Sequence, residues 1–83
     1  MNQYQTELQT LRPNDEIQNC YEHPSQKGYI FISTASHGFL VVPKDDKNYN
    51  IACKIQKKYG HKGQSAIYLE EDCQAGEFLD AIN

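Results

Sequence analysis

The sequence predicts an α+β domain: a small, mostly antiparallel sheet of three to four strands, with two to three helices packed on one face. The clearest strand, residues 29–34, and a second apolar stretch, residues 39–42, are separated by a connection of hairpin length. Two longer segments, residues 45–60 and 70–83, instead repeat their apolar side chains at helical spacing. This order of segments fits neither a solenoid nor a doubly wound sheet.

Length and composition narrow the class of protein. The 83 residues suit a single domain spanning 1–83, with a helix inside residues 1–12 and a core in residues 29–82. A net charge of −3 argues against strong nonspecific binding to nucleic acid or to anionic membranes. No apolar run approaches membrane-spanning length, and the polar stretch "MNQYQTELQT" does not resemble a signal peptide. We therefore expect a cytoplasmic protein, and its three separated cysteines do not suggest a secreted disulfide framework.

The first helix is predicted over residues 2–11. Tyr4, Leu8 and Leu11 follow the i, i+4, i+7 spacing of an amphipathic helix. Pro13 is expected to end it, because the residue before a proline disfavours helical geometry.

The segment after this helix is predicted as a turn followed by a weak strand. Asn14 and Asp15 are turn formers by residue type. Residues 16–23 have only weak alternation between apolar and polar positions. One face of this strand would carry Ile17, Asn19 and Tyr21, and the other Gln18, Cys20 and Glu22.

The sequence predicts an antiparallel hairpin of residues 29–34 and 39–42. Residues 29–34 are rich in β-branched and aromatic side chains, and Pro43 closes the second strand at residues 39–42. The connection consists of small polar residues and Gly38, which could supply a positive φ angle for the turn.

Two helices and one further strand follow. Asp45 or Asp46 could cap the helix in residues 45–60, and Gly60 could end it in a left-handed conformation. Residues 61–64 are predicted as a loop and residues 65–69 as a short third strand. In the last helix, Asp72 is the expected cap. The predicted core consists of Ile30, Ile32, Leu40, Val42, Ile51, Ile55, Ile67, Phe78, Leu79 and Ile82.

His37 is the first candidate for a functional residue. It lies next to Ser36 in the hairpin connection, but a catalytic pair needs side chains that meet in space and a third group that orients the base. The alternative is a polar hairpin tip with no chemistry.

The second candidate is the segment "LEEDCQ". Glu70, Glu71, Asp72 and Cys73 place three carboxylates and a thiol within four residues. A zinc or transition-metal site there would need further histidine or cysteine ligands, so no metal or other cofactor is predicted. The alternative is an acid-rich helix start, in which the neighbouring carboxylates oppose formation of the thiolate.

The third candidate is the lysine-rich segment from Lys54 to Lys62. It includes Lys57 and Lys58, and such a basic patch with an aromatic residue can bind a nucleic-acid backbone. The same lysines also fit the solvated face of an amphipathic helix. No phosphate loop, CxxC, HExxH or GxSxG motif occurs.

Two of these segments together resemble a family of small uncharacterised domains from phages, plasmids and other bacterial mobile elements. That family shows a Thr-Pro-Ser-His-Gly-Gly segment after a strand and a Tyr-Glu-Glu-Asp-Cys segment at the start of a final helix. Here Thr34, Ser36, His37 and Gly38 match the first segment, and residues 70–73 match the second. Departures from the pattern are Ala35, Phe39 and Leu69. The resemblance covers about residues 29–80 and implies a small accessory protein of a mobile element.

The two matched segments can lie together in a folded domain. If the third strand runs in the same direction as residues 29–34, His37 and the acids fall on the same edge of the sheet. Carboxylates could then hold the imidazole by hydrogen bonding.

We therefore expect a non-enzymatic protein that binds a larger host protein or complex, as an inhibitor of a defence system such as restriction or CRISPR interference. The candidate partner-binding residues are His37, Glu70, Glu71, Asp72, Lys57 and Lys58. One alternative is a small hydrolase or transferase that uses His37 with the Glu70–Cys73 cluster. The other is a nucleic-acid-binding module that uses Lys54–Lys62, although the acidic balance makes nucleic acid a poor direct ligand.

Overall fold

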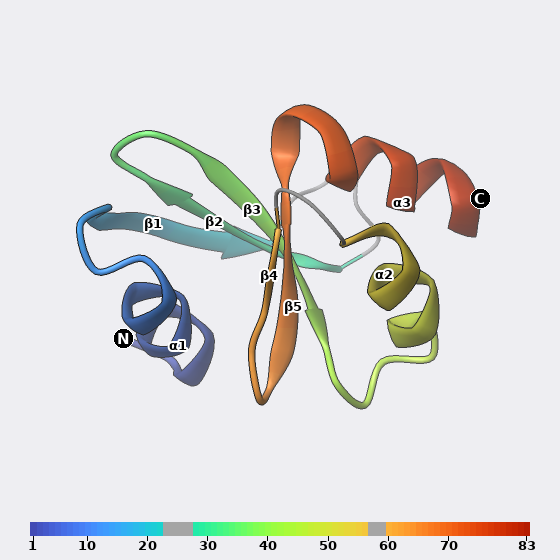
Figure 1. The fold of residues 1–83 in the computed structure, drawn as a ribbon, viewed down its shortest axis with the longest axis horizontal. Coiled ribbons are helices and arrows are strands. Elements are labelled where there is room, and N and C mark those ends of the chain that lie inside the picture. Colours follow the sequence, from blue (N-terminus) through green and yellow to red (C-terminus); the bar gives the residue numbers. More distant parts are fainter. Residues whose placement is uncertain (23–27, 57–59) are drawn as a thin grey trace.

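A five-stranded antiparallel sheet lies between two helical layers in the structure, a computed structural model that describes residues 1–22, 28–56 and 60–83 (Figure 1). The strands are β1 (Ile17–Glu22), β2 (Ile30–Thr34), β3 (Gly38–Pro43), β4 (His61–Lys62) and β5 (Ala66–Glu70). Their order across the sheet is β1-β2-β3-β5-β4, and every neighbouring pair is antiparallel. The predicted α+β class is confirmed. The sheet has more strands than expected because His61 and Lys62, predicted as loop, pair with Tyr68 and Ile67.

The helices cover both faces of the sheet. They are α1 (Gln3–Leu11), α2 (Tyr49–Ile55) and α3 (Gly76–Ile82), and a π-helical turn, η1 (Glu71–Ala75), leads directly into α3. Figure 1 shows α1 on one side of the strands, with α2 and α3 on the other. The prediction that all helices share one face was wrong for α1.

The composition of the central strands explains the two helical layers. All residues of β3 from Gly38 to Val42 and all residues of β5 from Ala66 to Leu69 are buried. Successive side chains of a strand point to opposite faces, so an unbroken apolar run needs cover on both sides. Phe39 packs in the cluster beneath α1, whereas the adjacent Leu40 packs beneath α2 and α3.

Each face therefore has its own core. The α1 side contains Leu8, Ile32, Phe39, Val41, Ala66 and Tyr68. The other side contains Tyr29, Leu40, Val42, Ala52, Ile67, Leu69, Ala75 and Phe78. Of the predicted core, Ile32, Leu40, Val42, Ile67 and Phe78 are fully buried. Ile30, Ile51, Ile55, Leu79 and Ile82 are partly buried against the two clusters.

A bulge in β1 explains its weak alternation. The register with β2 shifts between Ile17 and Asn19, which places an extra residue in β1. Ile17 and Cys20 consequently both pack against the α1-side core, although simple alternation assigns them to opposite faces.

Both long helices begin differently from the predictions. α2 starts at Tyr49 behind Asn48, and the carboxylate of Asp46 accepts hydrogen bonds from the Asn48 N–H and from Tyr29 instead of capping the helix. At η1, Glu70 is the cap in place of Asp72, since the Glu70 side chain accepts a hydrogen bond from the Asp72 N–H.

The glycines also have roles that the sequence did not predict. α2 ends at Ile55, and neither Gly60 nor Gly38 has a positive φ angle; among the described residues that angle occurs at Gly28. A Cβ atom on Gly38 would lie 2.5 Å from the ring of Phe31 and 2.9 Å from the Glu71 carboxyl carbon. Gly38 is therefore required for close packing rather than for the turn conformation.

None of the described helices is long and apolar enough to span a membrane.

Phe78 provides a test of the core on the α2–α3 side. Its ring is fully buried and meets the Tyr29 ring edge-on, with 5.5 Å between ring centroids. Phe78→Ala should lower the free energy of unfolding by about 3–5 kcal/mol, measured by urea denaturation followed by circular dichroism. Phe78→Leu is the milder variant if the alanine variant does not fold.

The matched control is Leu11→Ala, because the Leu11 side chain is 37% exposed. This substitution should lower the unfolding free energy by about 1 kcal/mol, well below the loss expected for Phe78→Ala. Equal losses in the Phe78 and Leu11 variants would contradict the assignment of Phe78 to the core.

Candidate functional site

The structure brings His37 to the acidic segment that opens the final helix. β2 and β5 run in the same direction on either side of β3, and Phe39 pairs with Glu70. The His37 Nδ1 atom consequently lies 3.9 Å from the Glu70 Oε1 atom. The proximity of these two segments, expected if the third strand ran in the direction of residues 29–34, is confirmed.

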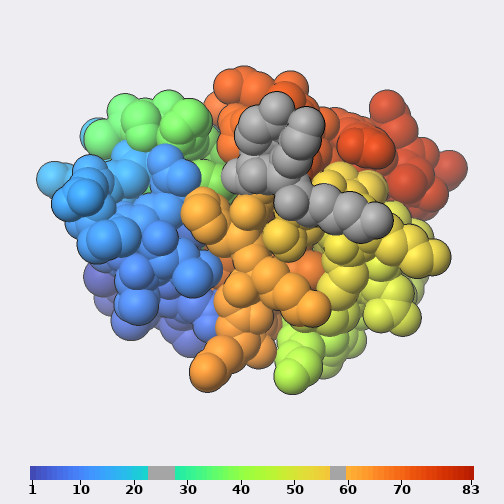
Figure 2. All heavy atoms as spheres, viewed as in Figure 1, coloured from blue at the N-terminus to red at the C-terminus, as the bar shows by residue number. Residues whose placement is uncertain are grey.

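These residues form one exposed surface, which we name the His37 rim: His37, Glu70, Glu71 and Asp72. The His37 side chain is 41% exposed and Glu70 is 13% exposed, while Glu71 and Asp72 are exposed. The hairpin tip and the start of η1 lie beside each other along the upper edge of the molecule in Figure 2. The rim therefore presents the His37 imidazole and the carboxylates of Glu71 and Asp72 to solvent, whereas Glu70 is largely covered.

A buried carboxylate, Asp15, holds the hairpin tip in place. Its Oδ2 atom accepts hydrogen bonds from Thr34 Oγ1 at 2.6 Å and from Arg12 Nε at 3.0 Å. Its Oδ1 atom accepts hydrogen bonds from the Ser36 N–H at 3.1 Å and from Ser36 Oγ at 2.8 Å. Asp15 thus connects the end of α1 to the tip between β2 and β3.

The turn itself is closed by further hydrogen bonds. The Thr34 N–H donates to the His37 carbonyl at 2.8 Å, and the His37 N–H donates to Thr34 Oγ1 at 2.9 Å. The Ala35 N–H donates to the Glu16 carbonyl at 2.9 Å. The backbone that carries the His37 side chain is therefore fixed on both sides of the turn.

Asp15 remains charged in the folded protein. Burial by itself would raise the pKa of its carboxyl, but the hydrogen bonds from Thr34, Ser36 and Arg12 outweigh burial and lower the pKa well below its usual range. Four donors to one carboxylate satisfy the group despite its low exposure of 7%.

Arg12 connects this network to β4, the strand at the edge of the sheet. Its Nη1 atom lies 3.1 Å from His61 Nε2, and its guanidinium lies 5.2 Å from the centre of the Phe39 ring. A guanidinium can only donate, so we assign the accepting, unprotonated nitrogen to Nε2 of His61. Burial and the neighbouring Arg12 charge both lower the pKa of His61, which favours its neutral form.

The tip geometry does not pair the Ser36 hydroxyl with the His37 imidazole. Ser36 Oγ donates its hydrogen bond to Asp15, whereas the His37 imidazole lies against Glu70 and the Phe39 ring. A serine nucleophile requires a base at hydrogen-bond distance from its oxygen. Within the part of the chain that the structure describes, no group of three His, Cys, Asp or Glu side chains is placed to hold a metal ion.

The lysine-rich candidate is only partly covered by the structure. Lys57 and Lys58 lie outside the described residues. Lys54, in the last turn of α2, and Lys62, in β4, are both exposed on separate elements.

A second carboxylate, the partly buried Glu7, fastens α1 to the turn between β4 and β5. It accepts hydrogen bonds from the Tyr68 hydroxyl at 2.7 Å, from Ser65 Oγ at 2.9 Å and from the Gln64 N–H at 2.8 Å. Burial opposes its ionisation, but these hydrogen bonds lower the pKa of Glu7, while burial and the Glu7 charge raise the pKa of Tyr68. Gly63 leaves room for this network, since a Cβ atom there would displace the Glu7 carboxylate.

Sequence reasoning missed both Asp15 and Glu7. The sequence predicts Asp15 only as a turn former and gives no signal that distinguishes Glu7 from other polar residues of a short helix. The available signal was the cluster of hydroxyl donors in "STAS", which needs an acceptor if the hairpin tip packs against the protein.

Asp15→Asn should destabilise the fold by about 2–3 kcal/mol at pH 7, because it replaces a charged acceptor of several hydrogen bonds. Glu16→Gln, next to it and exposed, is the control and should have an effect of about 0.5 kcal/mol or less. Urea denaturation of both variants and of the wild type measures the difference.

The lowered pKa of Asp15 predicts how the loss of unfolding free energy in Asp15→Asn depends on pH. A carboxyl with a lowered folded pKa stabilises the fold fully above its unfolded pKa of about 3.9, and this contribution is lost as the pH falls towards the folded pKa. The difference in unfolding free energy between the wild type and Asp15→Asn should therefore become smaller below about pH 4. A difference that stays constant down to the lowest pH at which the chain folds would contradict the assignment.

Comparisons of this chain with protein-family models, with curated proteins and with solved structures find no match.

Proposed function

We propose that the chain is a small non-enzymatic binding protein that engages a larger protein through the His37 rim. The main support for this proposal is that hydrogen bonds hold the backbone of the hairpin tip, from which the exposed His37 side chain projects. Asp15 and the turn hydrogen bonds hold the tip backbone, while the His37, Glu71 and Asp72 side chains remain accessible. A pre-organised polar surface loses less conformational entropy on binding than a mobile one.

The shape and the chemistry of the rim also support binding over catalysis. The cavities of about 320–920 Å³ that residues 1–22, 28–56 and 60–83 line lie away from His37, Glu70, Glu71 and Asp72. Active sites are usually concave, whereas protein-binding surfaces need not be. Both hydroxyls of the hairpin tip, those of Thr34 and Ser36, also donate hydrogen bonds to Asp15.

The acidic rim favours a partner with a basic surface. Opposite charges across an interface steer association and select the partner. Proteins that bind nucleic acid carry such basic surfaces. Together with the resemblance to a mobile-element family, this leads us to propose a nucleic-acid-binding complex of a host defence system, such as restriction or CRISPR interference, as the partner.

Charge reversal on the rim tests this proposal. Purified wild-type protein is used to capture its partner from host extract, and binding of the captured protein is then measured with purified components. Glu71→Lys/Asp72→Lys should weaken that binding about tenfold or more, because two attractive contacts become repulsive. The matched control is Glu77→Lys/Asp80→Lys, which makes the same charge change at two exposed positions of α3.

The control should bind within about threefold of wild type, which corresponds to less than 1 kcal/mol. Equal binding by wild type, rim variant and control would refute the rim as the interface. Catalytic turnover of the partner or of a ligand that His37→Ala abolishes, with the fold intact, would instead establish the enzyme alternative.

A further inference from the structure

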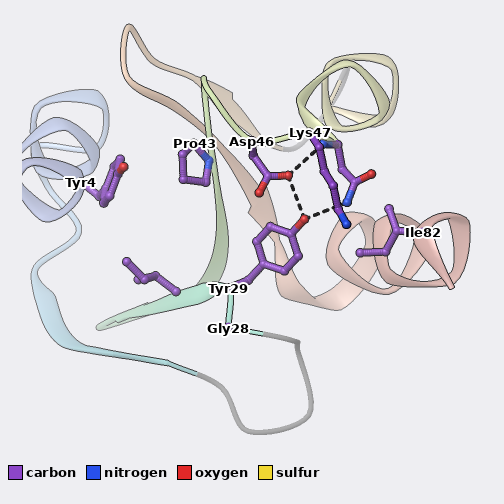
Figure 3. A pocket seen from close by; sticks show the side chains of 9 residues that line it. Tyr4, Gly28, Tyr29, Pro43, Asp46, Lys47 and Ile82 are labelled. Atoms are coloured by element: carbon purple, nitrogen blue, oxygen red, sulfur yellow. Dashed lines mark hydrogen bonds between the residues drawn. The ribbon is translucent and has the colours of Figure 1, made fainter.

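A cavity of about 400 Å³ lies at the end of the β2–β3 hairpin opposite to the His37 rim (Figure 3). Its walls come from α1, the start of β2, the end of β3, the loop before α2 and the last turn of α3, and include Tyr4, Tyr29, Pro43, Asp46 and Ile82. A volume of this size is within the usual range for a small-molecule site. The cavity does not involve the residues of the rim, so the inference is independent of the proposed function.

Asp46 is the acidic group of this cavity, and its orientation is fixed. Its Oδ2 atom accepts hydrogen bonds from the Tyr29 hydroxyl at 2.8 Å and from the Asn48 N–H at 2.9 Å. Asn48 Nδ2 in turn donates to the Tyr29 oxygen at 3.0 Å. The dashed lines in Figure 3 mark this network. The Tyr29 ring is itself held edge-on against Phe78.

The carboxylate of Asp46 can accept further hydrogen bonds. Among residues 1–22, 28–56 and 60–83, its Oδ1 atom accepts no hydrogen bond and the side chain forms no ion pair. Its partners Tyr29 and Asn48 are neutral donors, and burial together with the Asp46 charge raises the pKa of Tyr29, which keeps the phenol protonated. A negative charge therefore remains available at the cavity.

The rest of the lining suits an organic cation with an aliphatic chain. Tyr4 and Tyr29 contribute aromatic rings, which attract cations. Ile30, Pro43 and Ile82 contribute apolar surface. An anion would meet the Asp46 charge, and a divalent metal ion would find no second carboxylate in the lining.

We propose that this cavity binds a primary ammonium group on a short aliphatic chain, with the ammonium at Asp46 Oδ1 and the chain against Tyr29 and Ile82. This chemistry occurs both in free alkylamines and in the lysine side chain of a polypeptide. Lys47 also lines the cavity, so its own charge competes with the ligand.

The test is a nuclear magnetic resonance titration at pH 7 that follows the side-chain amide of Asn48, which contacts the Tyr29 hydroxyl. n-Butylammonium chloride should give saturable shifts, and 1-butanol, the neutral analogue, should not. Asp46→Asn should weaken binding about tenfold or more, because it removes a charge-assisted contact. Asp80→Asn, an exposed position on α3, should leave binding unchanged. Lys47→Met should strengthen it.

Nα-acetyl-lysine methylamide distinguishes the two sources of the ammonium. Tighter binding of this compound than of n-butylammonium indicates a polypeptide ligand, and the reverse order indicates a free amine. Equal shifts with 1-butanol and n-butylammonium, or equal amine binding by wild type and a folded Asp46→Asn variant, would overturn the proposal.

Discussion

The position of the exposed hairpin tip depends on one buried carboxylate. Asp15 receives hydrogen bonds from Arg12, Thr34 and Ser36, which come from the end of α1 and from the tip of the hairpin. Charge-assisted hydrogen bonds are stronger than neutral ones, and a carboxylate with all its donors in place tolerates burial that an isolated one would not. The segment "STASHG" is therefore polar because Thr34 and Ser36 serve as donors to Asp15, and this contact leaves His37 exposed beside Glu70.

The second carboxylate, Glu7, has a similar role in the middle of α1. It joins that helix to the turn between β4 and β5, as Asp15 joins it to the hairpin tip. A domain of this length has little apolar surface to bury, so the hydrogen bonds to these two carboxylates, Glu7 within α1 and Asp15 shortly after it, help to hold the helix against the sheet. The helix then completes the core on the face of the sheet where Leu8 meets Phe39 and Tyr68.

Local patterns in the sequence were enough for the fold class and for most elements. The α1 segment, the hairpin, the third predicted strand and the final helix follow from periodicity and turn residues that lie within a few positions of one another. The closeness of His37 to Glu70 also followed, once the direction of β5 was assumed. The second helical layer was missed, although the unbroken run from Phe39 to Val42 is typical of a strand that is buried on both faces.

The remaining features depend on partners that are distant in the sequence. Asp15 and Ser36 are 21 positions apart, and Glu7 and Tyr68 are 61 positions apart. Contacts between residues so far apart in the chain do not produce a periodic pattern in a single sequence, so periodicity cannot predict them. The same holds for the Tyr29–Asp46 network and for the bulge in β1, which reverses the faces that alternation assigns. Tertiary hydrogen bonds to single polar residues thus decide the details of both candidate sites.

Amide hydrogen exchange of Ser36 tests the central claim most directly, since its N–H donates to the Asp15 carboxylate. If Asp15 fixes the hairpin tip, the Ser36 amide should exchange as slowly as amides inside β2 and β3, although Ser36 lies in an exposed turn. Exchange of the Ser36 amide at the rate of an unprotected loop, while β2 and β3 remain protected, would contradict the account.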